Sequence, residues 1–430
     1  MSPVSERLVL PLGDGRATAA AVGPKAAMLG RLGQAGLPVP PGLCVTAEAY
    51  RRRLAAAGLV PAAASVASAE GHDGRRLALS IRLGLLRQPI DPELRGALTE
   101  AYEHIAAAPS TLLAVRSSAL GENRVDASFA GQFDSFLGIA AHEDLLTATR
   151  ACWASLWSTR ALRYMLARQI DPARGAMAVI VQRMVEAQAA GGALSQTPEG
   201  NSLITGTWGL GSVVAQGEVV PDRFELGRDG ALLRVEPGRK ERLAAATPET
   251  GPYWRAVARE RVEAPCLDEA EVVELGRMVR AAETIFGLPV ELEWARDTRG
   301  FQILQVRPLR VEMPQAAPEI WQRHPRLRGQ AAGVGWGSGP AAIVIDEHDL
   351  EHVRAGDVVV TELAGPALAA VLSRVAGVVA ELGGSTSHLA ALSRERGIPA
   401  VLGVRGATRQ IPHGAQVAVD GVTGVVRWSA

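Results

Sequence analysis

The sequence predicts a multidomain protein of mixed α/β and α+β class, and three observations support this prediction. At 430 residues the chain is too long for one compact hydrophobic core. Strand-like runs alternate with Ala/Leu/Arg-rich helical stretches from about residue 17 to 310. The segment 310–325 holds three prolines and cannot stay helical, so it predicts a linker. The strand-like runs after it predict a separate α/β domain of about a hundred residues.

Composition and charge exclude several classes of protein. The chain is 47% hydrophobic with mixed charge, which is typical of a globular protein and not of a disordered one. Its 45 basic residues balance 45 acidic ones, so we expect neither nucleic acid nor a membrane as a partner. The cysteines Cys44, Cys152 and Cys266 lack metal-ligand spacing and fit a reducing compartment. With no signal-peptide pattern and no run of about 18 apolar residues, we expect a cytoplasmic location.

Strand and helix patterns occur on both sides of the prolines. Before them, "MAVIVQRMV" (177–185) predicts a strand, and "LLTATRACWASLWSTRALRYMLARQ" (145–169) predicts a helical stretch. After them, one clear helix accompanies five short strand-like runs: "AAIVI", "DVVVT", "AGVVA", "PAVLGV" and "AQVAVDG".

The stretch "AELGGSTSHLAALSRERGIPAVLGV" (380–404) combines a turn with a helix start. Gly383–Gly384 would supply a tight turn after a buried strand. Ser385 is the expected N-cap of a helix over 386–396. Gly397 occupies the position of a left-handed C-cap, and the proline that follows prevents continuation.

This pattern places His388 in the first turn of the expected helix. Unpaired backbone N–H groups and the positive end of the helix dipole favour a bound anion there and disfavour imidazolium. A neutral imidazole beside an anion site suits nucleophilic attack on a phosphoryl group. The alternative is a histidine that is merely tolerated near a helix start, and the pattern alone leaves both interpretations open.

The N-terminal part carries residue types that suit a polyphosphate. "GPKAAMLGRLGQAGLPVPPG" (23–42) places Lys25 at an expected helix start, a good position for a phosphate-binding cation. "LLAVRSSALGENRVDASFAGQFDSFLGI" (112–139) places Arg116 at an expected strand end. Its "SFAGQ" segment (128–132) could fold over phosphates through backbone N–H groups. Each pattern also occurs in ordinary surface loops.

"VELEWARDTRGFQILQVRPL" (290–309) predicts a β-hairpin with a more specific arrangement. Glu293 and Gln305 lie one on each strand, and Arg307 shares a face with Gln305 because residues two apart on a strand point the same way. Oxygen ligands on adjacent strands, with an arginine beside them, suit a magnesium-bound polyphosphate. The alternative is a cross-strand polar pair on a solvated face.

Six linked motifs, in order along the chain, resemble the phosphoenolpyruvate-utilising enzyme family. Five resemble the ATP-binding domain of phosphoenolpyruvate synthase, pyruvate phosphate dikinase and rifampin phosphotransferase: "GPKAAMLGRLGQAGLPVPPGLCVTAEAY", "AVRSSAL…DASFAGQFDSFLG", "VIVQRMV", "WGLGSVVAQGEVVPDRFEL" and "ELEWA…ILQVRPL". The sixth, "GGSTSHLAALSRERGIPAVLGV" with "GAQVAVDGVTGVV" after it, resembles their swivelling phosphohistidine domain. The matches run in family order from about residue 23 to 426.

The resemblance implies an ATP-grasp ATP-binding domain over 1–312, a linker or hinge over 313–325 and a swivelling phosphohistidine domain over 326–430. It also implies a transferase of phosphorus-containing groups with paired acceptors. In this family the histidine attacks the β-phosphate of Mg-ATP and AMP leaves. The pyrophosphoryl-histidine then loses Pi, to water or phosphate, and domain swivelling carries the remaining phosphoryl group to an acceptor. In this chain His388 would be the phosphocarrier, with ATP and Mg²⁺ as cofactors.

The same resemblance assigns roles to further residues. Those that would hold the triphosphate and neutralise its charge are Lys25, Arg116 and Arg307. Those that would take magnesium are Glu293 and Gln305. Those that would line the adenine pocket are Gln182, Met184 and Val185, the last two through backbone groups. Those that would belong to a phosphate lid are Gly131 and Gln132. Met184 and Val185 also fit a plain core strand.

The chain departs from the family pattern at two places near the expected nucleotide site. Ser212 stands where "GLGE" would place an acidic residue. "AGGALSQT" (190–197), with Ser195 and Gln196, stands where a segment like "SGVLFT" is usual. Either departure could weaken ATP use or alter nucleotide choice, although we still expect an active enzyme.

The short linker leaves no room for the acceptor domains of the named enzymes, and three hypotheses follow. The acceptor site lies on a separate polypeptide, or a small-molecule or carrier-bound acceptor docks between the two domains. In the second case activation could lead to phosphorylation, dehydration or condensation. In the third, the protein senses nucleotide without turnover. Apolar residues near the linker could form a docking surface for a partner, although a buried core is their commoner fate: Ile320, Trp321 and Trp336.

Overall fold

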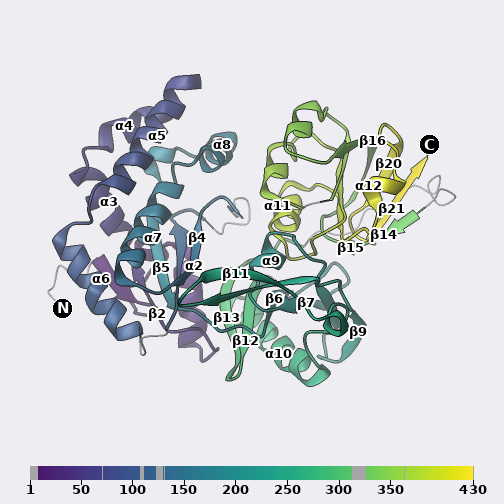
Figure 1. The fold of residues 1–430 in the computed structure, drawn as a ribbon, viewed down its shortest axis with the longest axis horizontal. Coiled ribbons are helices and arrows are strands. Elements are labelled where there is room, and N and C mark those ends of the chain that lie inside the picture. Colours follow the sequence, from purple (N-terminus) through teal and green to yellow (C-terminus); the bar gives the residue numbers. More distant parts are fainter. Residues whose placement is uncertain are drawn as a thin grey trace. The chain divides into compact units, whose positions relative to one another are not determined.

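The computed structural model describes residues 8–69, 71–106, 111–122, 129, 131–311, 326–362 and 364–429. The chain has mixed α/β structure, as expected, and it forms two compact units whose elements are labelled in Figure 1. Unit 1 comprises Met1–Val185, Ala246–Tyr253 and Gln302–Arg307. Unit 2 comprises Glu186–Ala245, Trp254–Phe301 and Pro308–Ala430. The expected linker or hinge at 313–325 lies outside the described residues, as do Ile320 and Trp321.

Unit 1 is built on an antiparallel five-stranded sheet in the order β1-β2-β5-β3-β4. Its strands are β1 (Val9–Pro11), β2 (Gly42–Val45), β3 (Leu113–Ala119), β4 (Ser135–Ile139) and β5 (Met177–Arg183). Strand β5 confirms the prediction for 177–185, and its first six residues are buried. The helices of this unit are α2 (Ala19–Gln34), α3 (Ala47–Ala56), α4 (Val60–Val66), α5 (Gly71–Arg87), α6 (Pro92–Ile105), α7 (His142–Ser155) and α8 (Thr159–Ala167), with a 3-10 turn η1 (Pro172–Arg174). Helices α2, α3 and α7 pack against the sheet.

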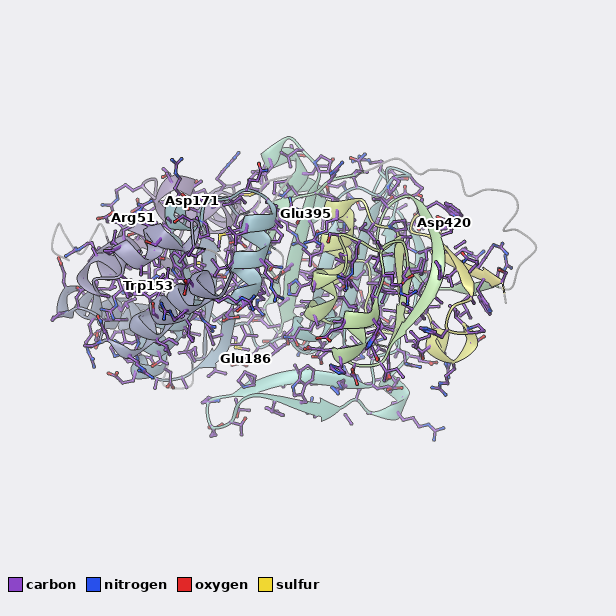
Figure 2. All side chains as sticks on the ribbon, turned by 90° about the horizontal axis from the view of Figure 1, so that it is seen from above. Arg51, Trp153, Asp171, Glu186, Glu395 and Asp420 are labelled. Atoms are coloured by element: carbon purple, nitrogen blue, oxygen red, sulfur yellow. The ribbon has the colours of Figure 1, made fainter. Side chains whose placement is uncertain are left out.

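The helical stretch predicted over 145–169 is two helices, α7 and α8. The break follows from Ser158, whose hydroxyl caps α8 by accepting a hydrogen bond from the amide of Ala161 at 3.2 Å. Trp153, labelled in Figure 2, and Trp157 are both fully buried beside the break. The Trp157 indole also donates to the hydroxyl of Tyr50 at 2.8 Å, which fixes the chain where it turns.

Helix α2 is kinked, and the kink positions a predicted site residue. Gly23 has a φ of 76°, and a side chain there would lie 2.4 Å from the carbonyl oxygen of Ser118 on β3, so only glycine fits. Pro24 then starts a second helical segment, as proline does at a first helical position. Lys25 therefore lies at a helix start, as predicted.

Unit 2 contains two sheets, of which the first has six strands in the order β13-β12-β6-β7-β8-β9. These are β6 (Ala189–Leu194), β7 (Ser202–Trp208), β8 (Asp222–Leu226), β9 (Leu232–Glu236), β12 (Val290–Asp297) and β13 (Gly300–Pro308). Strands β12 and β13 are neighbours, as the hairpin prediction required, and residues 302–307 of β13 belong to unit 1. Helix α10 (Glu269–Phe286) packs on this sheet between an Asp268 capping box and a left-handed Gly287.

Short elements connect the strands of this region. They are α9 (Ser212–Ala215), a separate ribbon of β10 (Arg242–Thr247) and β11 (Gly251–Ala256), and the 3-10 turn η2 (Arg259–Arg261).

The second sheet of unit 2 has eight strands in the order β14-β21-β20-β16-β17-β18-β19-β15. They are β14 (Arg326–Arg328), β15 (Gln330–Ala331), β16 (Trp336–Val344), β17 (Val358–Thr361), β18 (Gly377–Ala380), β19 (Ala400–Leu402), β20 (Gln416–Asp420) and β21 (Val425–Ser429). Strands β16 to β20 confirm the five predicted strand-like runs. Strands β16 to β19 pair in parallel. The helical elements are α11 (His388–Arg396), α12 (Ala407–Gln410), η4 (His348–His352) and η5 (Pro366–Ala370).

Valine dominates the interior of this second sheet. Val360, Val379 and Val401 come from three adjacent parallel strands and pack with Val417 and Val419 in one fully buried cluster. Trp336 is half-buried at the start of β16. None of the helices in the described residues has both the length and the apolar character needed to traverse a bilayer.

Candidate functional site

The loop before α11 differs from the prediction in one respect. Ser387, and not Ser385, caps the helix, because its hydroxyl accepts from the amide of Ala390 at 3.2 Å. Ser385 is instead a loop anchor whose hydroxyl donates to the carbonyl of Ala331 at 2.7 Å. The turn and C-cap predictions are confirmed by φ values of 91° at Gly383 and 67° at Gly397.

His388 is therefore the first residue of α11, one position inside the cap, and it is half-buried. Helix α11 has nine residues. As in any α-helix, its first backbone N–H groups have no partners within the helix and point out of the end at which His388 lies. The sequence prediction of a histidine in the first turn is confirmed.

The loop over 383–387, which directly precedes His388 and is called the His388 loop below, packs on the six-stranded sheet of the same unit. The hydroxyls of Thr386 and Thr205 on β7 lie 2.5 Å apart. A side chain at Gly192 on β6 would lie 2.6 Å from Cβ of Thr386, so the loop rests directly on strand backbone. The amide of Gly383 donates to the carbonyl of Val219 at 3.1 Å. Sequence reasoning missed these contacts, although the paired glycines in "AGGAL" were a signal of close backbone approach.

Lys25 in unit 1 is held by a partner that the sequence analysis did not identify. Its ammonium lies 2.7 Å from a carboxylate oxygen of Glu122 and donates to the carbonyl of Ser117 at 3.0 Å. Both side chains are nearly buried, at 10% and 4% exposed. The signal was an acidic residue six positions after Arg116 in "RSSALGE".

Arg116 lies in the middle of β3 and not at its end, because β3 continues to Ala119 alongside β5. Its guanidinium donates to the carbonyl of Leu304 and, at 3.4 Å, to the side-chain oxygen of Gln305. Gln305 and Arg307 are both buried on β13, at 9% and 7% exposed. Unit 1 thus brings Arg116 and Gln305 together, while Lys25 reaches the residue that follows Arg116 on β3.

The predicted adenine-pocket residues follow one another at the end of β5. The amide nitrogen of Gln182 donates to the carbonyl of Pro40 at 2.9 Å, and this side chain is buried. The backbone N–H of Met184 donates to the carbonyl of Leu112 at 2.8 Å. Val185 is 6% exposed and ends this part of unit 1. Two of these groups therefore have protein partners in this structure.

The predicted phosphate lid is described only in part, since residues 128 and 130 lie outside the described residues. Gly131 has a φ of 67°, and the amide of Gln132 donates to the carbonyl of Phe129 at 3.0 Å. Phe129 also has a positive φ, of 52°, which marks a sharply turning backbone.

Glu293 belongs to unit 2, where it lies half-buried on β12 opposite Gly192 of β6. Glu293 and His388 are thus in unit 2, whereas the other predicted site residues are in unit 1. No cluster of three or more His, Cys, Asp or Glu side chains suited to a metal occurs in the described part of the chain.

The two departures from the family pattern have different surroundings. Ser195 is fully buried, and its hydroxyl accepts from the amide of Val290 at 2.9 Å, so it joins β6 to β12. Gln196 is half-buried. Ser212 is half-buried at the first position of α9, and its carbonyl accepts from the amide of Gln216. Ser195 is therefore part of the sheet framework.

Two family models match different parts of the chain. Residues 19–326 match the model described as pyruvate phosphate dikinase, AMP/ATP-binding domain, and residues 353–424 match that of the PEP-utilising enzyme mobile domain. The chain is 33% identical to the phosphoenolpyruvate synthase of Aeropyrum pernix, over 94% of this chain and 56% of the relative. It is also 33% identical to a probable phosphoenolpyruvate synthase of Methanothermobacter thermautotrophicus, over 94% of this chain and 61% of the relative.

The chain therefore spans little more than half the length of these relatives. A solution structure of Enzyme I (nEIt) is 34% identical over 19% of this chain and 33% of its own, with a TM-score of 0.18. The family match covers well over half of the residues, so this chain belongs to the family of the pyruvate phosphate dikinase AMP/ATP-binding domain.

Proposed function

We propose that the chain catalyses the ATP-dependent phosphorylation of His388. A ring nitrogen of His388 attacks the β-phosphorus of ATP, the bond from that phosphorus to the oxygen of the α-phosphate breaks, and AMP leaves. The resulting pyrophosphoryl-histidine then loses its terminal phosphate to water or phosphate, and the phosphoryl group that stays on His388 passes to an acceptor. The observation that carries the proposal is the position of His388 at the capped start of α11, in a glycine- and serine-rich loop.

We assign the nucleotide to an ATP-grasp domain over residues 1–312. Lys25, Arg116 and Arg307 would bind the triphosphate and offset charge as it develops on the leaving group. Gly131 and Gln132 would cover the phosphates, and Gln182, Met184 and Val185 would line the adenine pocket. Because the N–H of Met184 already has a partner, its carbonyl is the group left for the adenine amino group.

Magnesium fits the oxygen donors that this proposal assigns to it. Glu293 offers a carboxylate and Gln305 an amide oxygen, which are the ligand types that magnesium accepts, with phosphate oxygens and water completing the shell. The 3.4 Å contact from Arg116 to the Gln305 oxygen would orient that amide. When held by Glu293 and Gln305, magnesium would reduce the negative charge of the phosphates.

The acceptor remains a separate part of the proposal. We propose domain limits of 1–312 and 326–430 joined by 313–325, with the acceptor on a partner polypeptide or docking between the domains as a small or carrier-bound molecule. Dehydration or condensation of such a molecule is the alternative outcome of its activation. A cytoplasmic location belongs to the same proposal, supported by three unpaired cysteines.

The test is incubation of the full chain with Mg-ATP labelled at the β- or the γ-position, with His388→Ala as control. Acid-labile protein label and AMP release are followed together. We expect β-label on the wild type, none on His388→Ala, and AMP in proportion. Transfer of γ-label alone with ADP release would contradict the proposal. ATP binding with no label on the protein would favour the nucleotide-sensing alternative.

A further inference from the structure

A buried ion pair joins the helix of His388 to the strand of Glu293. Arg394 on α11 lies 3.0 Å from a carboxylate oxygen of Glu291 on β12, and the two side chains are only 10% and 8% exposed. They are 103 positions apart in the chain and belong to different sheets of unit 2. Such a pair can form only while the two sheets are packed together.

The same guanidinium also holds the loop that precedes His388. Its other terminal nitrogen donates to the carbonyl of Ser385 at 2.6 Å and approaches that of Ala332 at 3.4 Å. Arg394 is less than two helical turns from His388, on a helix whose start is fixed by the Ser387 cap. A shift of Glu291 relative to Arg394 would therefore be transmitted to the position of the imidazole.

The carboxylate partner occupies an informative position on β12. Glu291 and Glu293 are two residues apart on one strand, so they lie on the same face of the sheet. One carboxylate binds the helix of the phosphocarrier, and the other is the proposed magnesium ligand. The strand thus relates the two groups by a fixed spacing.

Part of the rest of this contact is polar and formed by backbone groups and by threonine and glutamine side chains. It includes the Thr205–Thr386 hydroxyl pair, the Gly383-to-Val219 hydrogen bond and the 2.9 Å bond from the Gln330 amide to the carbonyl of Pro221. Polar contacts of this kind can be replaced by water when two surfaces separate, whereas a large apolar surface cannot. The ion pair is the contact with the strictest geometry, since a charge buried without its partner is costly.

We propose that Glu291 and Arg394 are positioning residues that hold the His388 loop in register with the strand of Glu293. This inference rests on the proposed function for its role in catalysis. The pair stabilises the packed arrangement, in which His388 would be phosphorylated. It separates, with both charges hydrated, when the loop leaves the six-stranded sheet.

The first experiment measures packing without any activity. In Thr205→Cys/Thr386→Cys the two sulfurs replace hydroxyls 2.5 Å apart, so a disulfide forms when the loop is packed. The native thiols do not compete, because burial raises the pKa of Cys44 to about 12 and raises the pKa values of Cys152 and Cys266. Adding Glu291→Gln should slow cross-linking roughly tenfold.

A matched control replaces a carboxylate whose partner lies in its own sheet. Glu236 on β9 pairs with Arg223 on β8, so Glu236→Gln removes the same charge and should leave cross-linking unchanged. Glu291→Asp, which keeps the charge, should cross-link faster than Glu291→Gln. Parent-rate cross-linking in Glu291→Gln would overturn the proposal, as would equal slowing by Glu236→Gln.

The second experiment links packing to chemistry. It uses chains without the introduced cysteines, in which Thr205 and Thr386 are native. Glu291→Gln should slow β-label transfer to His388 by a similar factor without changing the ATP concentration for half-saturation. Arg394→Gln should slow it too, and the double variant should be no slower than the slower single variant, because both remove one interaction. Additive losses would overturn the pairing.

Failure of the proposed function gives a different result. If the wild type acquires no β-label but Glu291→Gln still slows cross-linking relative to Glu236→Gln, the positioning pair stands and the phosphorylation of His388 does not. If the wild type is labelled and Glu291→Gln is labelled at the same rate, the positioning role is wrong.

Discussion

Two buried ion pairs of unit 2 look alike in chemistry and differ in what they connect. The Asp222–Lys240 pair is fully buried on both sides, and the Asp222 carboxylate also accepts from the amides of Gly238 and Cys266 at 2.7 and 2.8 Å. All these groups lie within 45 residues of one another, since 266 − 222 = 44. The Glu291–Arg394 pair instead joins two sheets that match two different family models.

The two pairs differ in whether their partners can separate without local unfolding, a property called separability here. Asp222 and Lys240 cannot part without breaking the local fold around β8, so their pair contributes to stability alone. Glu291 and Arg394 can part while each sheet keeps its own core, so their pair can act in a conformational step. Burial and distance do not distinguish the two cases, whereas the topology of the partners does.

The largest expected effect breaks the first pair. Asp222→Asn leaves the Lys240 ammonium buried without a counter-charge and should lower the free energy of unfolding by about 3–5 kcal/mol. Urea denaturation measures it. The control Asp73→Asn removes a pair whose side chains are 82% and 73% exposed, and should change stability little. A loss below that of a typical surface change would contradict the fixed role of Asp222.

Two adjacent glycines on β6 show the same difference, because one is in close contact within its own sheet and the other is in close contact with the His388 loop. A side chain at Gly191 would lie 2.0 Å from the backbone oxygen of Thr205, inside the sheet, whereas one at Gly192 would meet the Thr386 side chain. Gly191→Ala should therefore cost about 1–3 kcal/mol or more of unfolding free energy. Gly192→Ala should cost less and should displace the His388 loop.

The Gly192 expectation is measured by the cross-linking rate of the Thr205/Thr386 cysteine pair. Gly192→Ala should slow it, and Gly191→Ala is the control in which any slowing accompanies loss of stability. Unchanged cross-linking in Gly192→Ala would mean that the loop tolerates the added methyl group by a small shift.

Unit 1 offers a third kind of pair, in which a proposed ligand would compete with the protein. Glu122→Gln should lower stability without nucleotide by about 1–3 kcal/mol, since Lys25 loses its carboxylate. Because Lys25 is then less neutralised, Mg-ATP should raise the melting temperature of this variant more than that of the wild type. Lys25→Met should largely lose the ATP-induced rise. An equal ATP-induced rise in the melting temperature of Glu122→Gln and wild type would show that ATP does not bind Lys25.

Local patterns predicted local structure well in this chain. The strands of the second sheet, the hairpin at 290–309, the left-handed Gly397 and the place of His388 all follow from runs of neighbouring residues. The errors are also local: Ser387 replaces Ser385 as the cap, Arg116 lies mid-strand, and one predicted helical stretch is two helices. In each case several residues could have served, and tertiary contacts such as that of Ser385 with Ala331 decided between them.

Partners distant in sequence were not predictable from pattern alone. The stretch "RSSALGE" offers the acidic residue Glu122 but does not indicate that its partner is Lys25, 97 positions earlier (122 − 25 = 97). Likewise, nothing in "SRERG" shows which arginine of α11 faces β12. Such pairs depend on the packing of whole elements, which a single sequence does not specify.

The smallest expected effect concerns Glu381, which precedes the His388 loop but has its partners within its own sheet region. Its carboxylate accepts from the amides of Gly406 and Thr408, each at 2.9 Å, and from the Thr408 hydroxyl. Burial favours the neutral acid, but these hydrogen bonds and the charge of Arg409 outweigh it and lower the pKa of Glu381 below its ordinary 4.5. The stabilisation is therefore present above that ordinary value and is lost as the pH falls through the folded-state pKa.

Glu381→Gln should thus cost about 1 kcal/mol of unfolding free energy near neutral pH, and the gap from wild type should close in acid. Urea denaturation across the acid range measures it, with the exposed Glu249→Gln as a control that shows no such gap. Cross-linking of the Thr205/Thr386 cysteine pair should stay at the parent rate, because every named partner of Glu381 moves with the His388 loop. A slowed cross-link would instead mean that Glu381 supports the packed arrangement, and separability would then no longer distinguish it from Glu291.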